Sequence, residues 1–508
     1  MYPLKHSISD YHTELDWFRR WATYAPNQIA VQFEDSDDKL TYAECYQRVN
    51  QLAEYLVSEF KVKKGDRIAV LSLNSIDYLL LFFAVQKLGC ILVPLNFRFT
   101  AAELAWPLED ASPALLLHED AFTETVKKLE DDIPKIKIDS SDGFYAMAYK
   151  NANASEISHS GEFESPCMIL YTSGTTGRPK GAVITNKMLF WNSVNTGLRL
   201  NLTQHDVTIT FAPFFHTGGW NVLTTPFFHR GARLILSNKF EPEKVLQLCS
   251  NEKVTILFGV PTMMDMMRRT EAFENADLSS VRYAIVGGEP MPLNLIEDWH
   301  DKGIPIRQGY GLTEFGPNVF SLNEEDAIRK IGSIGFPNFY VNARILDEQG
   351  NDVPENTPGE LVLGGPAMMA GYWNNEKATN STIVNGWLHT GDIVRRDPEG
   401  YFYVMDRKKD MYISGAENVY PAEVEQIIRK ISGVREAAVI GVPDEKWGES
   451  GMAFIVVEDG KALTKETILE FCTGKLAKFK IPKHIRFIEE LPKSDSGKIL
   501  KRKLRDLI

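Results

Sequence analysis

The segment YTSGTTGRPKGA, residues 171 to 182, has the composition of a phosphate-binding loop. It follows an apolar run at residues 167 to 170 that is typical of a buried strand. Glycines let the backbone approach an anion, hydroxyl groups donate hydrogen bonds, and a lysine supplies a mobile positive charge. The predicted phosphate ligands are Thr172, Ser173, Gly174, Thr175, Thr176, Gly177 and Lys180.

The common P-loop pattern does not fit this segment. That pattern needs a glycine directly before its lysine and a Ser or Thr directly after it, whereas Lys180 lies between Pro179 and Gly181. The alternative is a surface turn rich in Gly, Ser and Thr. Such a turn rarely combines so many hydroxyl groups and two cations directly after a buried strand, so we favour a polyphosphate site.

A second motif, QGYGLTE at residues 308 to 314, combines glycines, an aromatic ring and oxygen ligands. Gly309 and Gly311 flank Tyr310, which allows that ring to lie against a flat purine. Thr313 and Glu314 offer oxygen ligands to Mg²⁺, which takes only one or two carboxylates when phosphate oxygens are also present. The alternative is a turn in which the tyrosine packs and the glutamate is solvated.

The segment FFHTGGW, residues 214 to 220, places a histidine among aromatic rings. A single histidine in such surroundings is more often a satisfied core residue than a catalyst. The aromatic side chains Phe214, Phe215 and Trp220 are candidate walls of an apolar pocket.

Two further motifs lie toward the C-terminus. In GWLHTGD, residues 386 to 392, the Asp392 carboxylate can accept two hydroxyl protons of a ribose, although a turn-stabilising aspartate gives the same pattern. In PKSDSGK, residues 492 to 498, Lys498 has a compact charge that suits a carboxylate and a phosphate oxygen together. Lys498 is one of eleven Lys and Arg residues between Lys475 and Arg505, so its position alone is weak support.

These motifs, in this order, resemble those of the adenylate-forming superfamily, which contains acyl-CoA synthetases, firefly-type luciferases and nonribosomal adenylation domains. The resemblance covers essentially the whole chain and is greatest to fatty acid–CoA ligases. It implies that a carboxylate attacks the α-phosphate of ATP and that a thiol then attacks the acyl carbon and releases AMP. ATP, Mg²⁺ and coenzyme A are the implied cofactors and co-substrates.

The resemblance also implies a role for each motif. Lys498, Thr313 and Glu314 act in adenylate formation, with Glu314 as the metal ligand, and His216 orients the entering carboxylate. The residues implied to line the nucleotide site beyond the first loop are Gly288, Glu289, Gly309, Tyr310, Gly311, Thr313, Asp392 and Arg407. The acyl group is implied to contact Phe214, Phe215 and Trp220.

A small C-terminal domain is implied to rotate on a hinge at Lys409 between the two half-reactions. The residues implied to meet coenzyme A there are Gly415, in the pantetheine tunnel, Trp447, Lys480 and Lys483. Some related ligases carry a cation where Ile481 stands, so the grip on this nucleotide is assigned to Lys480 or Lys483 instead.

The predicted function is an ATP-dependent acyl-CoA ligase for an apolar carboxylic acid, with a medium- or long-chain fatty acid favoured. Amino acids are disfavoured, because Trp220 and Asn221 stand where amino-acid-activating relatives keep an aspartate. Three alternatives stay open: an aryl acid–CoA ligase, an acyl-AMP ligase that loads a carrier protein, and a nucleotide sensor without catalysis.

Composition limits the class of protein. A chain of 508 residues exceeds one domain, and a net charge of −12 argues against nucleic acid as the main partner. The longest apolar run, residues 78 to 85, is too short to span a bilayer, and the first residues show no secretory signal. Five scattered cysteines are typical of reduced thiols, so we expect a cytoplasmic protein. A homodimer is compatible with the sequence, which leaves the oligomeric state open.

Short apolar runs alternate with helix-like segments, which indicates βαβ units and an α/β fold. The expected strands include residues 67–73, 114–117, 208–212, 232–236, 254–258 and 283–286, and a β-rich part is expected from residue 359. We predict a large N-terminal domain of stacked βαβ sheets with a β-rich subdomain at 1–405. A hinge at 406–410 and a small α+β domain at 411–508 follow it.

Overall fold

A computed structural model describes residues 15–34, 36, 38–150, 156–158, 160–172, 178–414, 417–493 and 499–508. The chain folds into two compact units. The first contains the residues up to Ile331 with Gly335–Asn342 and Gly364–Leu388, and the second contains Gly332–Ile334, Ala343–Leu363 and His389–Ile508. The predicted α/β class, with a large N-terminal and a small C-terminal part, is confirmed.

A long sheet runs through the first unit, with the strand order β15-β14-β13-β12-β11-β9-β10-β1-β2. Neighbouring strands from β13 to β1 are parallel, whereas β14 pairs with β13 and β15, and β2 with β1, in antiparallel fashion. The strands are β1 (Ile29–Phe33), β2 (Lys39–Thr41), β9 (Val207–Thr210), β10 (Arg233–Leu236), β11 (Ile256–Gly259), β12 (Tyr283–Val286), β13 (Ile306–Leu312), β14 (Gly316–Ser321) and β15 (Ser333–Pro337).

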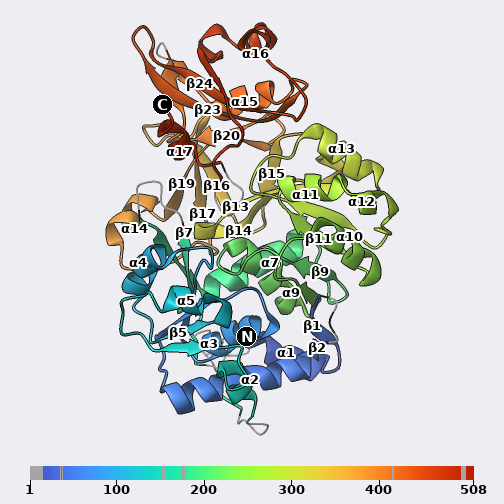
Figure 1. Ribbon diagram of the computed structural model, residues 1–508, viewed down its shortest axis with the longest axis vertical. Coiled ribbons are helices and arrows are strands. Elements are labelled where there is room, and N and C mark those ends of the chain that lie inside the picture. Colours follow the sequence, from blue (N-terminus) through green and yellow to red (C-terminus); the bar gives the residue numbers. More distant parts are fainter. Residues whose placement is uncertain are drawn as a thin grey trace, which may run out of the picture. The chain divides into compact units, whose positions relative to one another are not determined.

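Four helices pack against the middle of this sheet, and Figure 1 shows them grouped beside β11 and β15. They are α10 (Pro242–Asn251), α11 (Pro261–Arg268), α12 (Glu271–Asn275) and α13 (Leu293–Asp301). Leu246, Met264 and Trp299 of these helices share a buried cluster with Leu257 and Ile306 of the sheet. Because apolar burial is the main favourable term in folding, this cluster holds the strands that end at the predicted site.

A second sheet of the first unit carries the predicted phosphate loop. Its order is β6-β5-β3-β4-β7-β8, parallel except for the antiparallel hairpin β7–β8 at its edge. The strands are β3 (Arg67–Leu71), β4 (Ile91–Pro94), β5 (Leu115–His118), β6 (Lys135–Lys137), β7 (Pro166–Thr172) and β8 (Lys180–Thr185). Helix α4 (Ala101–Ala111) buries Leu104 and Leu108 against this sheet.

The remaining helices of the first unit surround these sheets. They are α1 (Trp17–Tyr24), α2 (Tyr42–Phe60), α3 (Ile76–Lys87), α5 (Thr123–Val126), α6 (Phe144–Tyr149), α7 (Asn186–Arg199), α8 (Thr217–Asn221), α9 (Thr224–Arg230) and α14 (Glu376–Thr382). Helix α2 begins with a reciprocal capping box, in which the Thr41 hydroxyl accepts the Glu44 N–H and the Glu44 carboxylate accepts the Thr41 N–H.

The second unit contains two groups of strands. Strands β16 (Asn342–Leu346), β17 (Gly359–Gly364), β19 (Trp387–Arg396) and β20 (Phe402–Arg407) are neighbours in that order. A five-stranded sheet joins β21 (Tyr412–Ser414), β22 (Glu417–Val419), β23 (Val434–Asp444), β24 (Gly448–Val457) and β25 (His484–Phe487). Helices α15 (Pro421–Ile428) and α16 (Lys465–Cys472) pack on it in one apolar cluster, and α17 (Lys501–Arg505) joins a separate one through Leu504.

Most expected strands are present within one to three residues of their predicted ends. The turn considered as an alternative at residues 308–314 does not describe most of that motif, because β13 continues to Leu312 and pairs with β14. Glycines are typical of a turn, but the antiparallel partner strand satisfies the backbone of this segment. The predicted boundary at 406–410 falls inside the second unit, so a division at this stretch stays a prediction.

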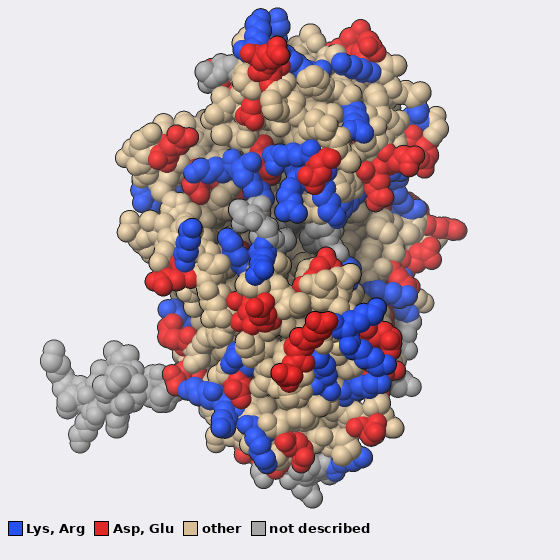
Figure 2. Space-filling view, turned by 60° about the vertical axis from the view of Figure 1, so that its left-hand side comes forward, with Lys and Arg blue, Asp and Glu red and all other residues tan. Residues whose placement is uncertain are grey.

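The surface mixes both signs of charge, and Figure 2 shows Lys and Arg side chains interspersed with Asp and Glu over the visible face. No helix within the described residues is long and apolar enough to cross a membrane. All five cysteines are buried free thiols, as the scattered spacing predicted.

A buried ion pair fastens the start of the described chain. The Lys87 Nζ lies 2.8 Å from Asp16 Oδ2, and the two side chains are 2% and 7% exposed. Asp16 also caps α1 by accepting the Arg19 N–H, and the Lys87 ammonium lies 4.6 Å from the centre of the Tyr46 ring. The pair therefore joins α1 to the end of α3.

Lys87→Met is expected to destabilise the protein by about 3–5 kcal/mol, because it removes the buried ammonium that pairs with the Asp16 carboxylate. Urea unfolding followed by tryptophan fluorescence measures the change. Lys127→Met is the matched control, since Lys127 pairs with Glu124 at 2.7 Å on an exposed surface, and it should leave the unfolding midpoint unchanged. Equal midpoints for the two variants would contradict this account.

Candidate active site

The β7–β8 hairpin presents the predicted phosphate loop. Thr172 is the last residue of β7 and pairs in register with Lys180, the first residue of β8. The Thr172 hydroxyl donates to the Lys180 carbonyl at 3.4 Å. The other predicted ligands of this loop, Ser173, Gly174, Thr175, Thr176 and Gly177, lie outside the described residues.

Helix α4 supports both arms of this hairpin. The Tyr171 hydroxyl donates to the Asp110 carboxylate at 2.7 Å, and the Trp106 indole N–H donates to the Pro179 carbonyl at 3.0 Å. The Arg178 guanidinium lies 4.3 Å from the centre of the Trp106 ring. The residues on either side of the loop are therefore attached to one helix, which fixes the width of the loop's base.

A segment about two hundred residues further along the chain pairs with β8. The Trp373 N–H donates to the Gly181 carbonyl at 2.7 Å, the Val183 N–H to Gly371 at 2.9 Å, and the Ala370 N–H to Val183 at 3.2 Å. Gly371 has φ +144°, and a side chain there would place Cβ 2.8 Å from Thr379. The pairing sets the position of Tyr372 beside the start of β8.

Tyr372 connects the predicted phosphate lysine with the predicted metal ligand. Its hydroxyl donates to Glu314 Oε1 at 2.9 Å, and the Lys180 ammonium lies 5.0 Å from the centre of its ring. Burial, followed by the charge of Glu314, raises the pKa of the Tyr372 phenol. The phenol therefore stays protonated at neutral pH and acts as a hydrogen-bond donor, which orients the carboxylate.

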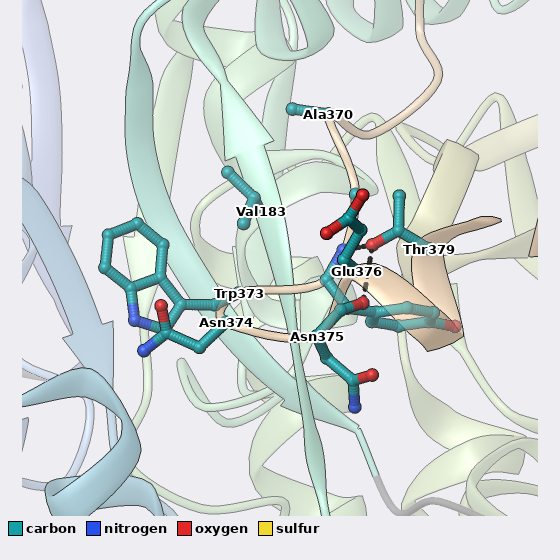
Figure 3. Close-up of a pocket in the computed structure, with 9 residues that line it drawn as sticks. Val183, Ala370, Trp373, Asn374, Asn375, Glu376 and Thr379 are labelled. Carbon is teal, nitrogen blue, oxygen red and sulfur yellow. Dashed lines mark hydrogen bonds between the residues drawn. The ribbon is translucent and has the colours of Figure 1, made fainter.

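We call residues 370–376, which extend the sheet beside β8, the added segment. An open pocket of about 590 Å³ lies along it (Figure 3). Val183 of β8, residues 370–376 and Thr379 line it. The Thr379 hydroxyl accepts the Tyr372 N–H and donates to the Asn375 carbonyl, both at 2.9 Å. Because Tyr372 belongs to the wall, the pocket shares one residue with the contacts that Lys180 and Glu314 each make.

The segments predicted to meet adenine are neighbours in the long sheet. Gly288 and Glu289 follow β12, which pairs in parallel with β13. The Gln308 amide donates to the Glu289 carbonyl at 3.1 Å, and its oxygen accepts the Met291 N–H at 3.1 Å. This side chain holds the 287–291 loop beside Gly309, Tyr310 and the rest of the second motif.

One glycine of the second motif is required by the hairpin itself. A Cβ on Gly311 would lie 2.0 Å from the Pro317 carbonyl oxygen of β14. Tyr310 is half-buried and meets Phe320 edge-on, with 5.8 Å between ring centres. Thr313 and Glu314 form the short 3-10 turn that joins β13 to β14. The role of Tyr310 toward a purine stays a prediction.

The predicted acyl-pocket aromatics are part of the core. Phe214 and Trp220 are 1% and 0% exposed and stack with 4.1 Å between ring centres, while Phe215 meets Phe97 edge-on. His216 is half-buried and directly precedes α8. The roles of Phe214, Phe215 and Trp220 as walls of an acyl pocket, and of His216 in orienting the acid, stay predictions.

Helix α8 is fastened to the strand that follows Glu314. The Asn318 amide of β14 donates to the Asn221 and Val222 carbonyls at 3.1 and 3.0 Å. The histidine segment and the turn with the predicted metal ligand therefore contact the same strand, although they lie about a hundred residues apart in the chain.

The second unit brings Asp392 and Arg407 together. They are register partners in β19 and β20, and Arg407 Nε lies 2.7 Å from Asp392 Oδ1. Asp392 is 3% exposed and lies within a strand, so the alternative of a turn-stabilising aspartate is wrong. Lys409 follows β20 in a turn, and Gly415 and Lys498 lie outside the described residues.

The cations predicted to bind coenzyme A already have carboxylate partners. Lys480 Nζ lies 2.8 Å from both Glu423 oxygens, and Lys483 pairs with Asp444. The hydrogen bond from Lys483 lowers the pKa of Asp444 to about 2. Trp447 is 40% exposed, with the Lys446 ammonium 5.0 Å from its ring centre.

Three side chains of this site were not predicted from the sequence: Tyr372, Asp110 and Trp106. Tyr372 had a signal, since GYW follows a glycine- and methionine-rich run after a predicted strand. Asp110 and Trp106 had none, because they lie in an ordinary amphipathic helix. Among the described residues, no group of three or more His, Cys, Asp and Glu is placed to hold a metal, so any cation here depends on one carboxylate and on the ligand's own oxygens.

Comparison with protein families gives two matches. The AMP-binding enzyme family matches residues 18–373, and the AMP-binding enzyme C-terminal domain matches residues 423–498. Together the two matches include the hairpin, the second motif and the added segment with Tyr372.

Three curated proteins are similar to the chain over almost its whole length. A feruloyl-CoA synthase of Amycolatopsis sp is 38% identical over 96% of this chain and 98% of its own. A 2-succinylbenzoate–CoA ligase of Bacillus cereus is 37% identical, and an indoleacetate–CoA ligase of Aromatoleum aromaticum is 34% identical, each over 97% of this chain and 98% of its own.

Three solved structures share the fold. ATP-bound MatB from Rhodopseudomonas palustris has a TM-score of 0.90 at 30% identity over 97% of this chain and 99% of its own. The o-succinylbenzoate coenzyme A synthetase MenE from Bacillus subtilis, in complex with ATP and magnesium ion, has 0.87 at 32% identity over 97% and 99%. A Mycobacterium tuberculosis fatty acyl CoA synthetase has 0.78 at 35% identity over 97% and 98%.

Tyr372→Phe removes the hydroxyl that orients Glu314 and keeps the ring beside Lys180. We expect the affinity for ATP with magnesium to fall about tenfold, the effect of one hydrogen bond to a charged group. Isothermal calorimetry with and without magnesium measures it. Tyr46→Phe is the matched control, since the Tyr46 hydroxyl donates to Glu156 at 2.7 Å on another part of the unit. The affinity of this variant for ATP with magnesium should equal that of the original protein. An unchanged affinity in Tyr372→Phe would refute the orienting role.

Proposed function

Because the chain belongs to the AMP-binding enzyme family and is an acid–CoA ligase of that family, we propose that its acid substrate is an aryl carboxylic acid. The observation that carries the substrate class is the agreement of three relatives, whose names all specify an acid with an aromatic ring: ferulate, 2-succinylbenzoate and indoleacetate. For this reason we favour an aryl acid over the fatty acid that the sequence alone favoured. A fatty acid remains the second candidate, supported by the likeness to the fatty acyl CoA synthetase.

The reaction consumes ATP and coenzyme A and passes through an acyl-adenylate. Its first half must bring a carboxylate against a triphosphate, so positioning and charge neutralisation are the main requirements. Lys180 contributes a positive charge at the edge of the phosphate hairpin, and Tyr372 holds the Glu314 carboxylate beside it. We assign to Lys498 the cation that approaches both reactants.

Magnesium fits this arrangement. Glu314 accepts a hydrogen bond from Tyr372, whose ring also meets the Lys180 ammonium, and one such carboxylate is enough for Mg²⁺ when phosphate oxygens are present. When bound, Mg²⁺ supplies further neutralisation of phosphate charge. The chain's own contribution is the fixed direction of Glu314, which Tyr372 and the turn between β13 and β14 provide.

The ribose is assigned to Asp392 and Arg407. The buried carboxylate of Asp392 is held in place by Arg407, and carboxylate oxygens are acceptors that suit the two hydroxyl groups of a diol. Gly288, Glu289 and Tyr310 are assigned to the adenine. His216 is assigned to the orientation of the acid, with Phe214, Phe215 and Trp220 behind it.

The second half transfers the acyl group to the thiol of coenzyme A. We assign Lys409 as the hinge of the domain movement and Gly415 to the pantetheine tunnel. Trp447, Lys480 and Lys483 are assigned to the nucleotide of coenzyme A. Because both lysines are paired with carboxylates, binding of coenzyme A phosphates competes with Glu423 and Asp444 for them.

A panel of acids tests the substrate class. With ATP, magnesium and coenzyme A, aryl acids such as ferulate should give both pyrophosphate and thioester, with kcat/KM at least about tenfold above octanoate and palmitate. Pyrophosphate is measured by a coupled assay and thioester by chromatography. A preference for the fatty acids would contradict the aryl proposal, and pyrophosphate without thioester would indicate a carrier-protein acceptor.

The Lys498→Ala variant distinguishes the requirements of the two half-reactions, adenylate formation and thioester formation. Adenylate formation should fall by about a hundredfold or more, because a charge aimed at the transition state is lost. Thioester formation from supplied acyl-AMP should remain within about twofold of the original enzyme, since that half does not require the lysine. The two halves are measured in separate assays, and an equal loss in both would overturn the assignment.

A further inference from the structure

A buried group of charges links the strand before the predicted hinge to the parts of the chain after it. We define the hinge latch as Asp406, Glu425 and Lys501. Asp406 lies at the end of β20, three residues before Lys409, and is 7% exposed. Glu425 lies in α15 and Lys501 begins α17, so both follow Lys409 in the chain.

Asp406 caps a helix from the other side of the hinge. Its Oδ2 accepts the Ala422 N–H at 2.7 Å, in the first turn of α15, where no side chain of the helix's own N-cap residue does so. Its Oδ1 accepts the Arg407 N–H at 2.7 Å. A carboxylate at a helix N-terminus satisfies an unpaired backbone donor and is favoured by the helix dipole.

Lys501 adds the cation of the group. Its Nζ lies 2.9 Å from Glu425 Oε1, and the two side chains are 14% and 9% exposed. The same Glu425 oxygen accepts the Val439 N–H at 2.7 Å. Burial alone would lower the pKa of the Lys501 ammonium, but the charges of Glu425 and Asp406 outweigh burial and raise it.

We propose that the hinge latch holds the C-terminal segment in the arrangement for adenylate formation and opens when the enzyme passes to thioester formation. A rotation about Lys409 moves α15 and α17 together but not the preceding strand, so the Lys501–Glu425 pair stays intact. The same rotation must break the hydrogen bond between Asp406 and Ala422 and take the positive charge of Lys501 away from Asp406. This inference rests on the roles proposed above for Lys409 and Lys498.

The direction of the effect follows from the neighbours of the latch. Arg407, next to Asp406, pairs with the predicted ribose ligand Asp392. Lys501 is three residues after Lys498, a stretch of chain that spans at most about 10 Å. The closed latch therefore attaches the segment bearing the predicted catalytic lysine to the strand that bears the ribose pair.

Energetics make this contact selective for one arrangement. A buried carboxylate and a buried ammonium are stable only when they are paired and hydrogen-bonded, so removal of one partner leaves an uncompensated charge. Asp406 thus favours the arrangement in which it accepts the Ala422 N–H and the positive charge of Lys501 acts on it. A buried pair with a purely structural role would instead affect both half-reactions alike.

Two variants of the full-length chain test the latch: Asp406→Asn, which keeps the shape of the side chain, and Lys501→Met. Pyrophosphate release from ATP and acid should fall about tenfold in both. Thioester formation from supplied acyl-AMP and coenzyme A should stay the same or rise. Lys501→Arg, which retains the charge, should recover most of the pyrophosphate release.

Arg505→Met is the matched control. Arg505 lies in the same helix as Lys501, but its partner Asp410, at 3.7 Å, also follows the hinge, so this pair does not separate on rotation. The ratio of the two half-reactions should be unchanged in this variant. Equal losses of both halves in the latch variants, or a loss of thioester formation alone, would overturn the proposal.

A second measurement does not require turnover. Trypsin cleavage after Arg407, Lys408 or Lys409 should be faster in Lys501→Met than in Arg505→Met, because an open latch frees the hinge. Equal cleavage rates would refute the latch even if no acid is turned over. An unaltered pyrophosphate release in Lys498→Ala would instead refute the proposed role of that lysine, so the two failures are distinguishable.

Discussion

Three backbone hydrogen bonds between β8 and the segment at residues 370–373 determine the geometry of the active site. Backbone pairing fixes register, and register fixes which side chains face each other. This pairing brings Tyr372 to both Lys180 and Glu314, although the three residues belong to segments far apart in the sequence. If the register changed by one residue, Trp373 would take the place of Tyr372 and the glutamate would lose its donor.

The chemistry explains why such a junction is needed. A carboxylate and a triphosphate repel each other, and a protein lowers that repulsion best with charges that are already in place before the reaction. Lys180 begins strand β8, and Glu314 lies in a short 3-10 turn. The phenol of Tyr372 limits both, because it donates to the carboxylate and offers its ring face to the ammonium. Helix α4 restricts the same hairpin through Asp110 and Trp106.

The sequence predicted local structure and motif chemistry well, and long-range pairing poorly. Apolar runs identified β3, β5, β9, β10 and β12, because buried parallel strands are continuous in hydrophobicity. The strand before the phosphate loop was expected from residue types, whereas the use of Asp392 and Arg407 together was implied by the family resemblance. The role of Asp110 could not be predicted, since its carboxylate meets Tyr171 only after two strands and a helix have packed together. The continuation of β13 was missed for the same reason: its partner β14, rather than its own composition, makes it a strand.

The division of the chain by packing differs from the division by the predicted domain movement. Packing groups β16, β17, β19 and β20 with the C-terminal sheet, because contacts such as Asp406 to Ala422 join them. A functional division at Lys409 would cut through those contacts. A stretch at which a domain must move cannot be held by a large apolar core, because such a core would oppose every rotation. It can be held by a few charged groups, whose attraction depends on geometry and is lost over a short displacement. The position of Asp406, Glu425 and Lys501 around the predicted hinge meets that requirement, and it accounts for ionisable side chains where packing alone would favour apolar ones.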